Sequence, residues 1–177
     1  FLCKKLEGNL AHKIVYCFHV LRQMYHIATS KVVVLDSYCI AVSVLCQRKS
    51  LTVIQMWHAL GALKRFGLSI VGEGEGSSRD LAESMSMHKN YTWVLTSGSA
   101  CLPYFSEAFG YDEKAVKVMS LPRVDKLTDD EFARSAVKRV RERYPRFEGK
   151  KIVVYAPTFR KDKDISREID DLAEKFD

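Results

Sequence analysis

The sequence has 177 residues, of which 47% are hydrophobic and 28% are charged, and its formal net charge is +6. This ordinary globular composition supplies enough apolar material for a buried core, as one large domain or as parts of two. The positive charge favours anionic partners, such as phosphorylated substrates, acidic lipid surfaces or nucleic acid, without choosing among them.

The cysteines and the apolar runs argue against three classes of structure. The five cysteines are odd in number and contain no CxxC pair, so neither a disulfide framework nor a zinc ribbon is indicated. The longest apolar run, residues 32–46, is broken by Asp36 and is shorter than the ~20 residues that span a bilayer. Because the chain begins at Phe1 and ends at Asp177 inside a predicted helix, we expect it to be a fragment.

An amphipathic helix is predicted from Leu10 to about Ile27, because apolar residues recur there at helical spacing. The residues of its expected buried stripe are Ile14, Phe18, Leu21 and Tyr25. Three histidines, His12, His19 and His26, share the opposite face at intervals of two turns. That interval is too long for a metal-binding pair, so we expect a solvated or membrane-facing surface.

Two short strands are predicted next. Residues 31–36 form a β-branched run that suits a buried parallel strand, with Asp36 at its carboxyl end. A helix over residues 38–47 and a turn then lead to a second apolar strand, residues 51–56. This alternation predicts neighbouring parallel strands.

The segment after the second strand carries the candidate chemistry. His58 stands at the carboxyl end of that strand, and residues 61–66 are helix formers that end at Gly67. In open α/β sheets this edge binds ligands, and the N–H groups of a following helix, with Lys64 beside them, suit an anion. An imidazole there fits a reaction on a phosphate ester, in which it removes a hydroxyl proton. The alternative is a packed, structural histidine beside Trp57.

Residues 72–78 contain three glycines but no GxGxxG spacing, and the two glutamates among them would repel a phosphate. We therefore expect a mobile surface loop, followed by a helix over residues 80–88.

A third strand is predicted at residues 91–96, and hydroxyl side chains follow it at Ser97 and Ser99. Ser99 is placed either to cap a helix that runs through Ala108 and ends at Gly110, or to contact a substrate.

The next predicted elements are a strand over residues 115–119 and a turn over residues 122–125. Residues 128–131 then have the form of a capping box and open another helix, which Pro145 ends. Its expected inner face consists of Phe132, Ala136, Val140 and Tyr144. Its outer side carries Arg134, Lys138, Arg139, Arg141 and Arg143. This basic side is either a solvated surface or a contact with acidic lipid.

A last strand over residues 151–155 and a charged helix over residues 161–177 complete the alternation. The order of elements predicts an α/β fold with a Rossmann-like, doubly wound parallel sheet and helices on both faces. We expect a domain boundary between residues 123 and 150.

Three stretches of the sequence resemble motifs of a known family. Trp57, His58, Gly61, Ala62 and Lys64 occupy positions of a Trp-His-Ala-x-Gly-Ala-x-Lys motif. Downstream, residues 121–125 read Leu-Pro-Arg-Val-Asp and residues 155–160 read Tyr-Ala-Pro-Thr-Phe-Arg. Together these stretches resemble the CDP-glycerol glycerophosphotransferases, which make and extend teichoic acids. Three motifs in order are more specific than any one of them.

The resemblance implies a GT-B arrangement, two Rossmann-like domains facing each other across a cleft. Residues 1–146 would form the acceptor-side N-terminal domain, and residues 147–177 the beginning of a truncated nucleotide-binding domain. His58 would be the catalytic base, and no metal or other cofactor is expected. The residues implied in substrate or phosphate binding are Lys64, Ser97, Ser99, Arg123, Asp125, Thr158 and Arg160.

The implied reaction moves glycerol phosphate from CDP-glycerol to a hydroxyl of a lipid-linked polyol-phosphate acceptor and releases CMP. The expected partners are therefore the donor CDP-glycerol, that acceptor and an anionic membrane surface. The expected location is the cytoplasmic face of the cell membrane, with peripheral attachment.

Three alternatives remain at this stage. The donor is CDP-ribitol or another CDP-polyol, or the protein is a nucleotide-sugar glycosyltransferase of the same fold. From a different class, the basic helix suggests a non-catalytic polyanion-binding module. Nucleic acid is not expected as a partner, because the interleaved aromatic residues and base-reading motifs are missing.

Overall fold

The computed structural model describes residues 2, 9–74, 76–154 and 156. The chain forms two compact units, residues 1–133 and residues 134–177. The first unit contains every strand of the described residues.

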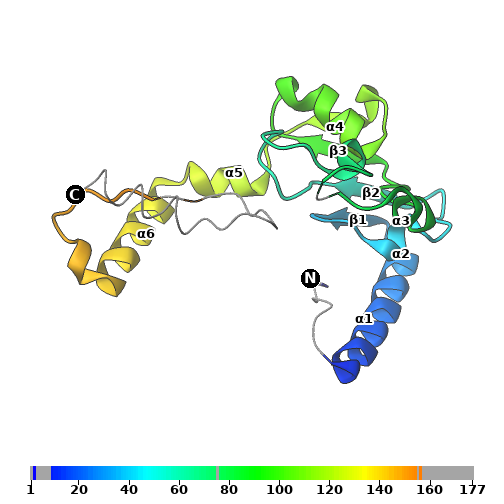
Figure 1. Cartoon of the computed structure of the whole chain (residues 1–177), viewed down its shortest axis with the longest axis horizontal. Helices are drawn as coiled ribbons and strands as arrows, with labels where there is room; N and C mark the ends of the chain where they lie inside the picture. The colour runs from blue at the N-terminus through cyan, green and yellow to red at the C-terminus, as the bar shows by residue number, and fades with distance from the viewer. Residues whose placement is uncertain (1, 3–8, 75, 155, 157–177) are drawn as a thin grey trace. The chain divides into compact units, whose positions relative to one another are not determined.

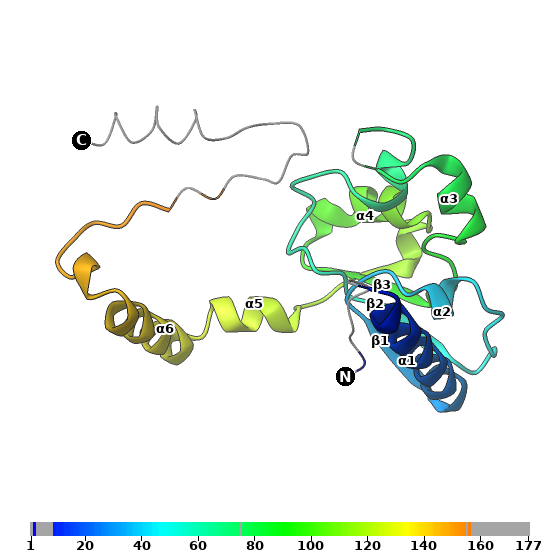
Figure 2. The same ribbon diagram turned by 60° about the horizontal axis from the view of Figure 1, so that its bottom comes forward.

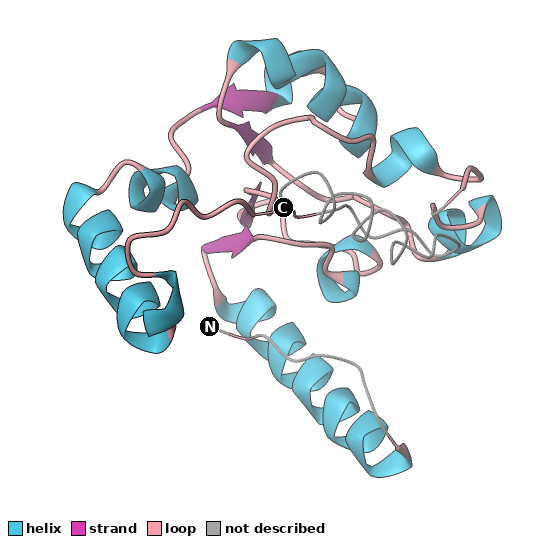
Figure 3. Ribbon diagram, turned by 60° about the vertical axis from the view of Figure 1, so that its left-hand side comes forward, coloured by secondary structure: helices cyan, strands magenta, loops and turns pink. Residues whose placement is uncertain are grey.

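Four parallel strands form the sheet of the first unit (Figure 3). They are β1 (Val32–Leu35), β2 (Thr52–Gln55), β3 (Trp93–Thr96) and β4 (Val116–Val118). The strands pair in chain order, and the register aligns Leu35 with Gln55 and Gln55 with Val94. The predicted parallel α/β fold is confirmed, and the carboxyl ends of the strands meet at one edge.

Short helices connect the strands. They are α2 (Ile40–Ser43), η1 (Gly67–Ile70), α3 (Arg79–Ser84), η2 (Ser99–Cys101), α4 (Leu102–Phe109) and η3 (Glu113–Ala115). Ser78 caps α3 by accepting a hydrogen bond from the N–H of Leu81, and α4 ends at Gly110 in the left-handed conformation, as predicted. The helix predicted over residues 38–47 is only one turn, α2.

One face of the sheet is packed under α4, which lies over β3 and β4 (Figure 1 and Figure 2). Phe105 and Phe109 of α4 are fully buried, and they join Val53 and Val94 in one core cluster. The two valines come from adjacent strands and point to this face, so burial of these four side chains joins α4 to the sheet.

The other face of the sheet is partly exposed among the described residues, although Leu95 on it is buried. Val32 and Val34 of β1 are each about half exposed, at 53% and 52%, and Trp93 of β3 is 38% exposed. Lys117 covers part of this face, with its ammonium 4.4 Å from the centre of the Trp93 ring. Helices were predicted on both faces, and the helix contacts described above lie on the face that carries Val53 and Val94.

The first helix, α1 (Leu10–Thr29), forms as predicted, but its packing face is not the predicted one. It extends away from the sheet, with its carboxyl end nearest β1 (Figure 1 and Figure 3). Ile27 is buried and Met24 packs against the core. The predicted buried stripe is exposed: Ile14, Phe18, Leu21 and Tyr25. The prediction was wrong because α1 meets the core through its last turns and on a different side.

Residues 122–125, predicted as a turn, lie in a helix, α5 (Pro122–Leu127). Pro122 occupies the first turn of α5, where a missing N–H costs nothing and a fixed φ favours the helix.

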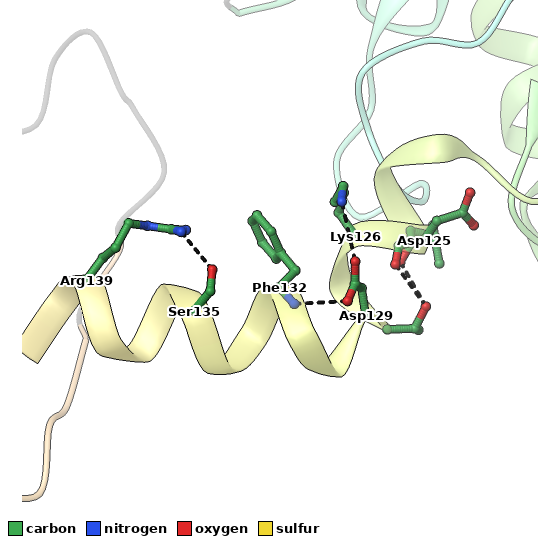
Figure 4. Close-up of polar contacts among 8 residues, drawn as sticks. Asp125, Lys126, Asp129, Phe132, Ser135 and Arg139 are labelled. Carbon is green, nitrogen blue, oxygen red and sulfur yellow. Dashed lines mark hydrogen bonds and ion pairs between the residues drawn. The ribbon is translucent and has the colours of Figure 1, made fainter.

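The next helix, α6 (Asp130–Arg143), begins at a different cap from the one predicted (Figure 4). The Asp129 carboxylate accepts a hydrogen bond of 2.9 Å from the N–H of Phe132, and Lys126 lies 3.4 Å from the same carboxylate. The hydrogen bond from Phe132 is the main cause of a lowered pKa at Asp129. Thr128 instead donates its hydroxyl to carbonyl groups of α5, so Asp129 is the N-cap.

No residue of α6, which is described over its full length, is buried. The expected inner face contains Phe132, Val140 and Tyr144, all of which are more than 40% exposed. The helix therefore presents both its apolar and its basic side chains at the surface of the described residues.

The end of the described chain contains no further strand. Residues 145–147 form a short helix, η4 (Pro145–Phe147), and residues 151–154 are exposed and irregular, where a strand was predicted. Ile152 to Val154 have no strand beside them among the described residues, so their β-branched side chains have nothing to pack against. The helix predicted over residues 161–177 lies outside the described residues. Among the helices that the structure describes, none has the length and apolarity to cross a membrane.

A buried histidine, His88, packs among aromatic side chains of the core. His88 is 3% exposed and has edge-on ring contacts with Tyr38, Trp57 and Phe109. Its Nδ1 lies 3.1 Å from the hydroxyl of Tyr91. Burial lowers the pKa of His88 from its ordinary value of 6.5 to about 4, so the ring is neutral in the folded protein at neutral pH.

This burial predicts a pH-dependent stability. Between pH 6.5 and about pH 4 the unfolded chain binds a proton at His88 that the folded chain does not. The contribution of His88 to stability is therefore complete above pH 6.5 and is lost as the pH falls, by roughly 3 kcal/mol at most. Urea unfolding at a series of pH values should show this slope, and His88→Gln should reduce it. An unchanged slope in the variant would assign the pH dependence to other groups.

Candidate active site

His58 lies where β2 ends, at the carboxyl edge of the sheet, and its side chain is exposed. Its Nδ1 is 3.0 Å from the backbone carbonyl oxygen of Asp36, which follows the adjacent strand β1. A carbonyl can only accept a hydrogen bond, so this contact requires a proton on Nδ1. In the neutral ring, Nε2 then carries the lone pair that can take a proton from a substrate.

Trp57 turns the chain so that His58 can reach back to Asp36. Its φ is +58°, a left-handed conformation that costs a bulky residue about 1–3 kcal/mol. The Trp57 ring stacks on Phe66 at 5.2 Å and contacts Phe109 edge-on at 5.4 Å. Aromatic pairs are worth about 0.5–1.5 kcal/mol each, so these contacts are large enough to offset the strain.

The segment after His58 is not the predicted helix. Residues 61–66 form bends, and a short 3₁₀ helix, η1, begins at Gly67. Gly67 has a φ of +59°, and a Cβ atom there would lie 2.3 Å from the carbonyl oxygen of Ala108. Phe66 is held against Trp57 and Phe105, which fixes the path of the chain by packing. Helix propensity over residues 61–66 was therefore overridden, and the expected anion site at a helix start is absent from this segment.

Lys64 lies on this bent segment and is exposed at the surface. The neighbouring Arg65 pairs with Glu73 at 2.8 Å, which ties the segment to the glycine-containing loop. Lys64 therefore provides a positive charge six residues after His58, but without the dipole of a helix that was predicted to start there.

Ser97 follows β3 and donates its hydroxyl to the backbone carbonyl of Leu60. This bond joins the loop after β3 to the loop that carries His58, with the contact two residues beyond His58. Ser99 is exposed in η2 and does not cap a helix through its side chain. Both hydroxyl groups remain at the carboxyl edge of the sheet.

Arg123 and Asp125 are exposed on α5, which follows β4. Among the described residues, no hydrogen bond or ion pair joins either side chain to His58. Thr158 and Arg160, the other two predicted phosphate-binding residues, lie outside the described residues.

A cavity of about 1040 Å³ lies between α1 and the carboxyl end of β1. Its lining includes Asp36, Ser37, Tyr38 and Met56 from the loops around His58, and Arg22 and His26 from α1. Asp36 is also the partner of the His58 ring, so the cavity begins beside the candidate base.

Two groups at this edge were not predicted from the sequence. One is the backbone carbonyl of Asp36, because side-chain motifs say nothing of a carbonyl. The other is Gln55, a fully buried amide whose oxygen accepts a hydrogen bond of 2.8 Å from the N–H of Trp57. A polar residue at an inward position of an apolar strand was the available signal for Gln55.

The match to a family model covers nearly the whole chain. The model described as CDP-Glycerol:Poly(glycerophosphate) glycerophosphotransferase matches residues 4–176. A teichoic acid ribitol-phosphate primase of Bacillus spizizenii is 37% identical over 159 residues, which cover 90% of this chain and 41% of the primase. A teichoic acid glycerol-phosphate primase of Bacillus subtilis is 30% identical over 142 residues, which cover 80% of this chain and 36% of that primase.

The fold is similar to that of a solved relative. A structure of the wall teichoic acid polymerase TagF, a histidine variant soaked with CDPG, has a TM-score of 0.61 and 20% sequence identity. The match covers 82% of this chain and 37% of TagF, so the chain spans less than half the length of each of these three relatives. With the match over residues 4–176 and the parallel sheet that carries His58 at its carboxyl edge, the chain belongs to the CDP-glycerol:poly(glycerophosphate) glycerophosphotransferase family.

Proposed function

We propose that the protein transfers a polyol phosphate from a CDP-polyol to a hydroxyl of a growing teichoic acid and releases CMP. The observation that carries this proposal is the His58 ring, whose Nδ1 is held by the Asp36 carbonyl so that Nε2 is available as a base. Membership of the family supplies the class of reaction.

The proposed step moves one proton and exchanges one phosphorus–oxygen bond. Nε2 of His58 takes the proton of the acceptor hydroxyl as its oxygen attacks the phosphorus that bears the polyol. The bond from that phosphorus to the bridging oxygen of CMP breaks, and CMP leaves with the electron pair. Phosphoryl transfer depends on positioning and on stabilisation of negative charge, so cations beside the phosphate are required.

Residues beyond His58 have proposed roles in that stabilisation. Lys64 and Ser97 belong to the loops around His58, and Ser99 lies just beyond Ser97. The proposal extends phosphate or substrate binding to Arg123, Asp125, Thr158 and Arg160, as the motifs imply. It also assigns residues 1–146 to the acceptor-side domain and residues 147–177 to the start of the nucleotide-binding domain. The cavity beside Asp36 is the proposed binding place of the acceptor.

The base role predicts the effect of His58→Ala in the complete protein. General-base catalysis contributes about 10²–10⁴ in rate, so CMP release should fall by that factor while the circular dichroism spectrum is unchanged. His12→Ala is the matched control, because His12 is exposed on α1. Near-normal turnover by folded His58→Ala protein would remove His58 from the mechanism.

The comparisons favour ribitol over glycerol as the transferred polyol. Identity to the ribitol-phosphate primase is 37% over 90% of this chain, whereas identity to the glycerol-phosphate primase is 30% over 80%. The motif resemblance alone pointed to CDP-glycerol, so both donors belong to the proposal, with CDP-ribitol as the preferred one.

Donor choice is tested by turnover with CDP-ribitol and CDP-glycerol supplied separately to the complete protein with a teichoic acid acceptor. We expect a higher kcat/KM for CDP-ribitol, since substrate discrimination is a difference in transition-state binding. A preference for CDP-glycerol would reverse the assignment. Turnover of a nucleotide sugar, and of neither CDP-polyol, would replace the proposed polyol-phosphate transfer with glycosyl transfer.

We propose that the protein attaches peripherally to the cytoplasmic face of the membrane, where its lipid-linked acceptor would be anchored. The support is the exposed basic side of α6 and the exposed apolar stripe of α1, a helix without acidic residues. Each lysine or arginine near an anionic surface is worth about 1 kcal/mol, and the attraction fades within a Debye length.

Vesicle sedimentation tests this attachment. The protein should sediment with phosphatidylglycerol vesicles at low salt and be released as salt rises. Charge reversal at Arg134, Lys138 and Arg141 should weaken the association, whereas reversal of three exposed lysines elsewhere, Lys49, Lys89 and Lys114, should weaken it less. Equal effects of the two triple variants would show that only net charge matters and that α6 is not the contact.

A further inference from the structure

Gln55 joins the two loops that meet at the candidate base. Its side chain is 0% exposed at the end of β2. The amide oxygen accepts a hydrogen bond of 2.8 Å from the N–H of Trp57, and the amide nitrogen donates one of 3.0 Å to the carbonyl of Ser37. One buried side chain therefore holds the loop after β1 and the loop after β2 at the same time.

The two backbone groups that Gln55 holds are adjacent to the two partners of the His58 hydrogen bond. Ser37 directly follows Asp36, whose carbonyl accepts from the His58 ring, and Trp57 directly precedes His58. Movement of either backbone group would change the distance between Nδ1 of His58 and the Asp36 carbonyl. The register that aligns Gln55 with Leu35 places the amide between the two loops.

We propose that Gln55 is a positioning residue that keeps His58 in the tautomer with the proton on Nδ1 and the lone pair on Nε2. The proposal rests on the proposed function in so far as Nε2 is the base, but the tautomer itself is a property of the free protein. Gln55 touches no substrate. It acts through the backbone of Ser37 and Trp57.

Loss of the amide removes a side-chain hydrogen bond with Tyr91 and has two consequences for the loops at the candidate base. The partly buried N–H of Trp57 loses its acceptor, and ring packing is left to hold Trp57 at its φ of +58°. The carbonyl of Ser37 loses its donor, so the loop that contains Asp36 is free to shift. Without a fixed carbonyl opposite Nδ1, an imidazole populates both tautomers, and in one of them the proton blocks Nε2.

The test is the tautomer of His58 in the complete protein, measured without substrate. Protein labelled with ¹⁵N in its histidine rings is studied by NMR at alkaline pH, where neutral tautomers are distinguished by their nitrogen shifts. His58→Ala identifies the signals of His58. We expect a single Nδ1–H form in the parent protein and a mixture in Gln55→Met, together with a kcat lower by about 10- to 100-fold and little change in KM.

Gln47→Met is the matched control. Gln47 is also a glutamine that hydrogen-bonds the backbone, donating 3.0 Å bonds to the carbonyls of Ala41 and Val42, but it lies away from His58. Its replacement should change stability and leave the His58 tautomer unchanged. If Gln55→Met does not fold, Gln55→Glu keeps the shape and an acceptor for Trp57, and it replaces the donor to Ser37 by a negatively charged carboxylate oxygen that cannot donate to that carbonyl.

The results separate this inference from the proposed function. A pure Nδ1–H form in both Gln55 variants, or an equal shift in Gln47→Met, would overturn the positioning role. If the tautomer shifts as expected but His58→Ala retains full transfer, the positioning role stands and the base assignment fails.

Discussion

The hydrogen bond between the His58 ring and the Asp36 carbonyl is the contact on which the candidate site depends. It exists because β1 and β2 are parallel neighbours, so that the loops after both strands leave the sheet at the same edge. The carbonyl selects the protonated ring nitrogen, which leaves the other nitrogen at the protein surface. Without this partner the ring would still contact Trp57, with 4.0 Å between the ring centroids, but no group would select its tautomer.

Packing below the site supports this arrangement. Trp57, Phe66, His88 and Phe109 form a connected set of ring contacts between β2, η1 and α4. These contacts pack apolar rings against Trp57, whose backbone is strained. Burial in the same set keeps His88 neutral by lowering its pKa to about 4. The packing of the core and the position of the candidate base are therefore coupled, and we expect a change in one to affect the other.

Sequence patterns predicted correctly those elements whose structure is determined by their own residues. The β-branched runs gave the positions of β1 and β2, and His58 was correctly placed at a carboxyl end. The predictions failed where packing against residues distant in the sequence determines the local structure. Residues 61–66 have helical composition, but packing of Phe66 against the core and the approach of Gly67 to Ala108 impose bends. The exposed stripe of α1 shows the same limit, since periodicity reveals an apolar side but not what covers it. The polar Gln55 within an apolar strand was a signal in the sequence, but its partners and the role of the Asp36 carbonyl follow only from the positions of the two loops.

In the proposed mechanism, Nε2 of His58 faces the acceptor hydroxyl while Nδ1 stays on the Asp36 carbonyl. The most direct measurement is a crystal structure of the complete protein with an unreactive CDP-polyol analogue and an acceptor. We expect Nε2 within about 3 Å of the acceptor hydroxyl, with the contact to Asp36 preserved. A ring turned so that Nδ1 leaves Asp36, or an acceptor hydroxyl bound to a different side chain, would contradict it.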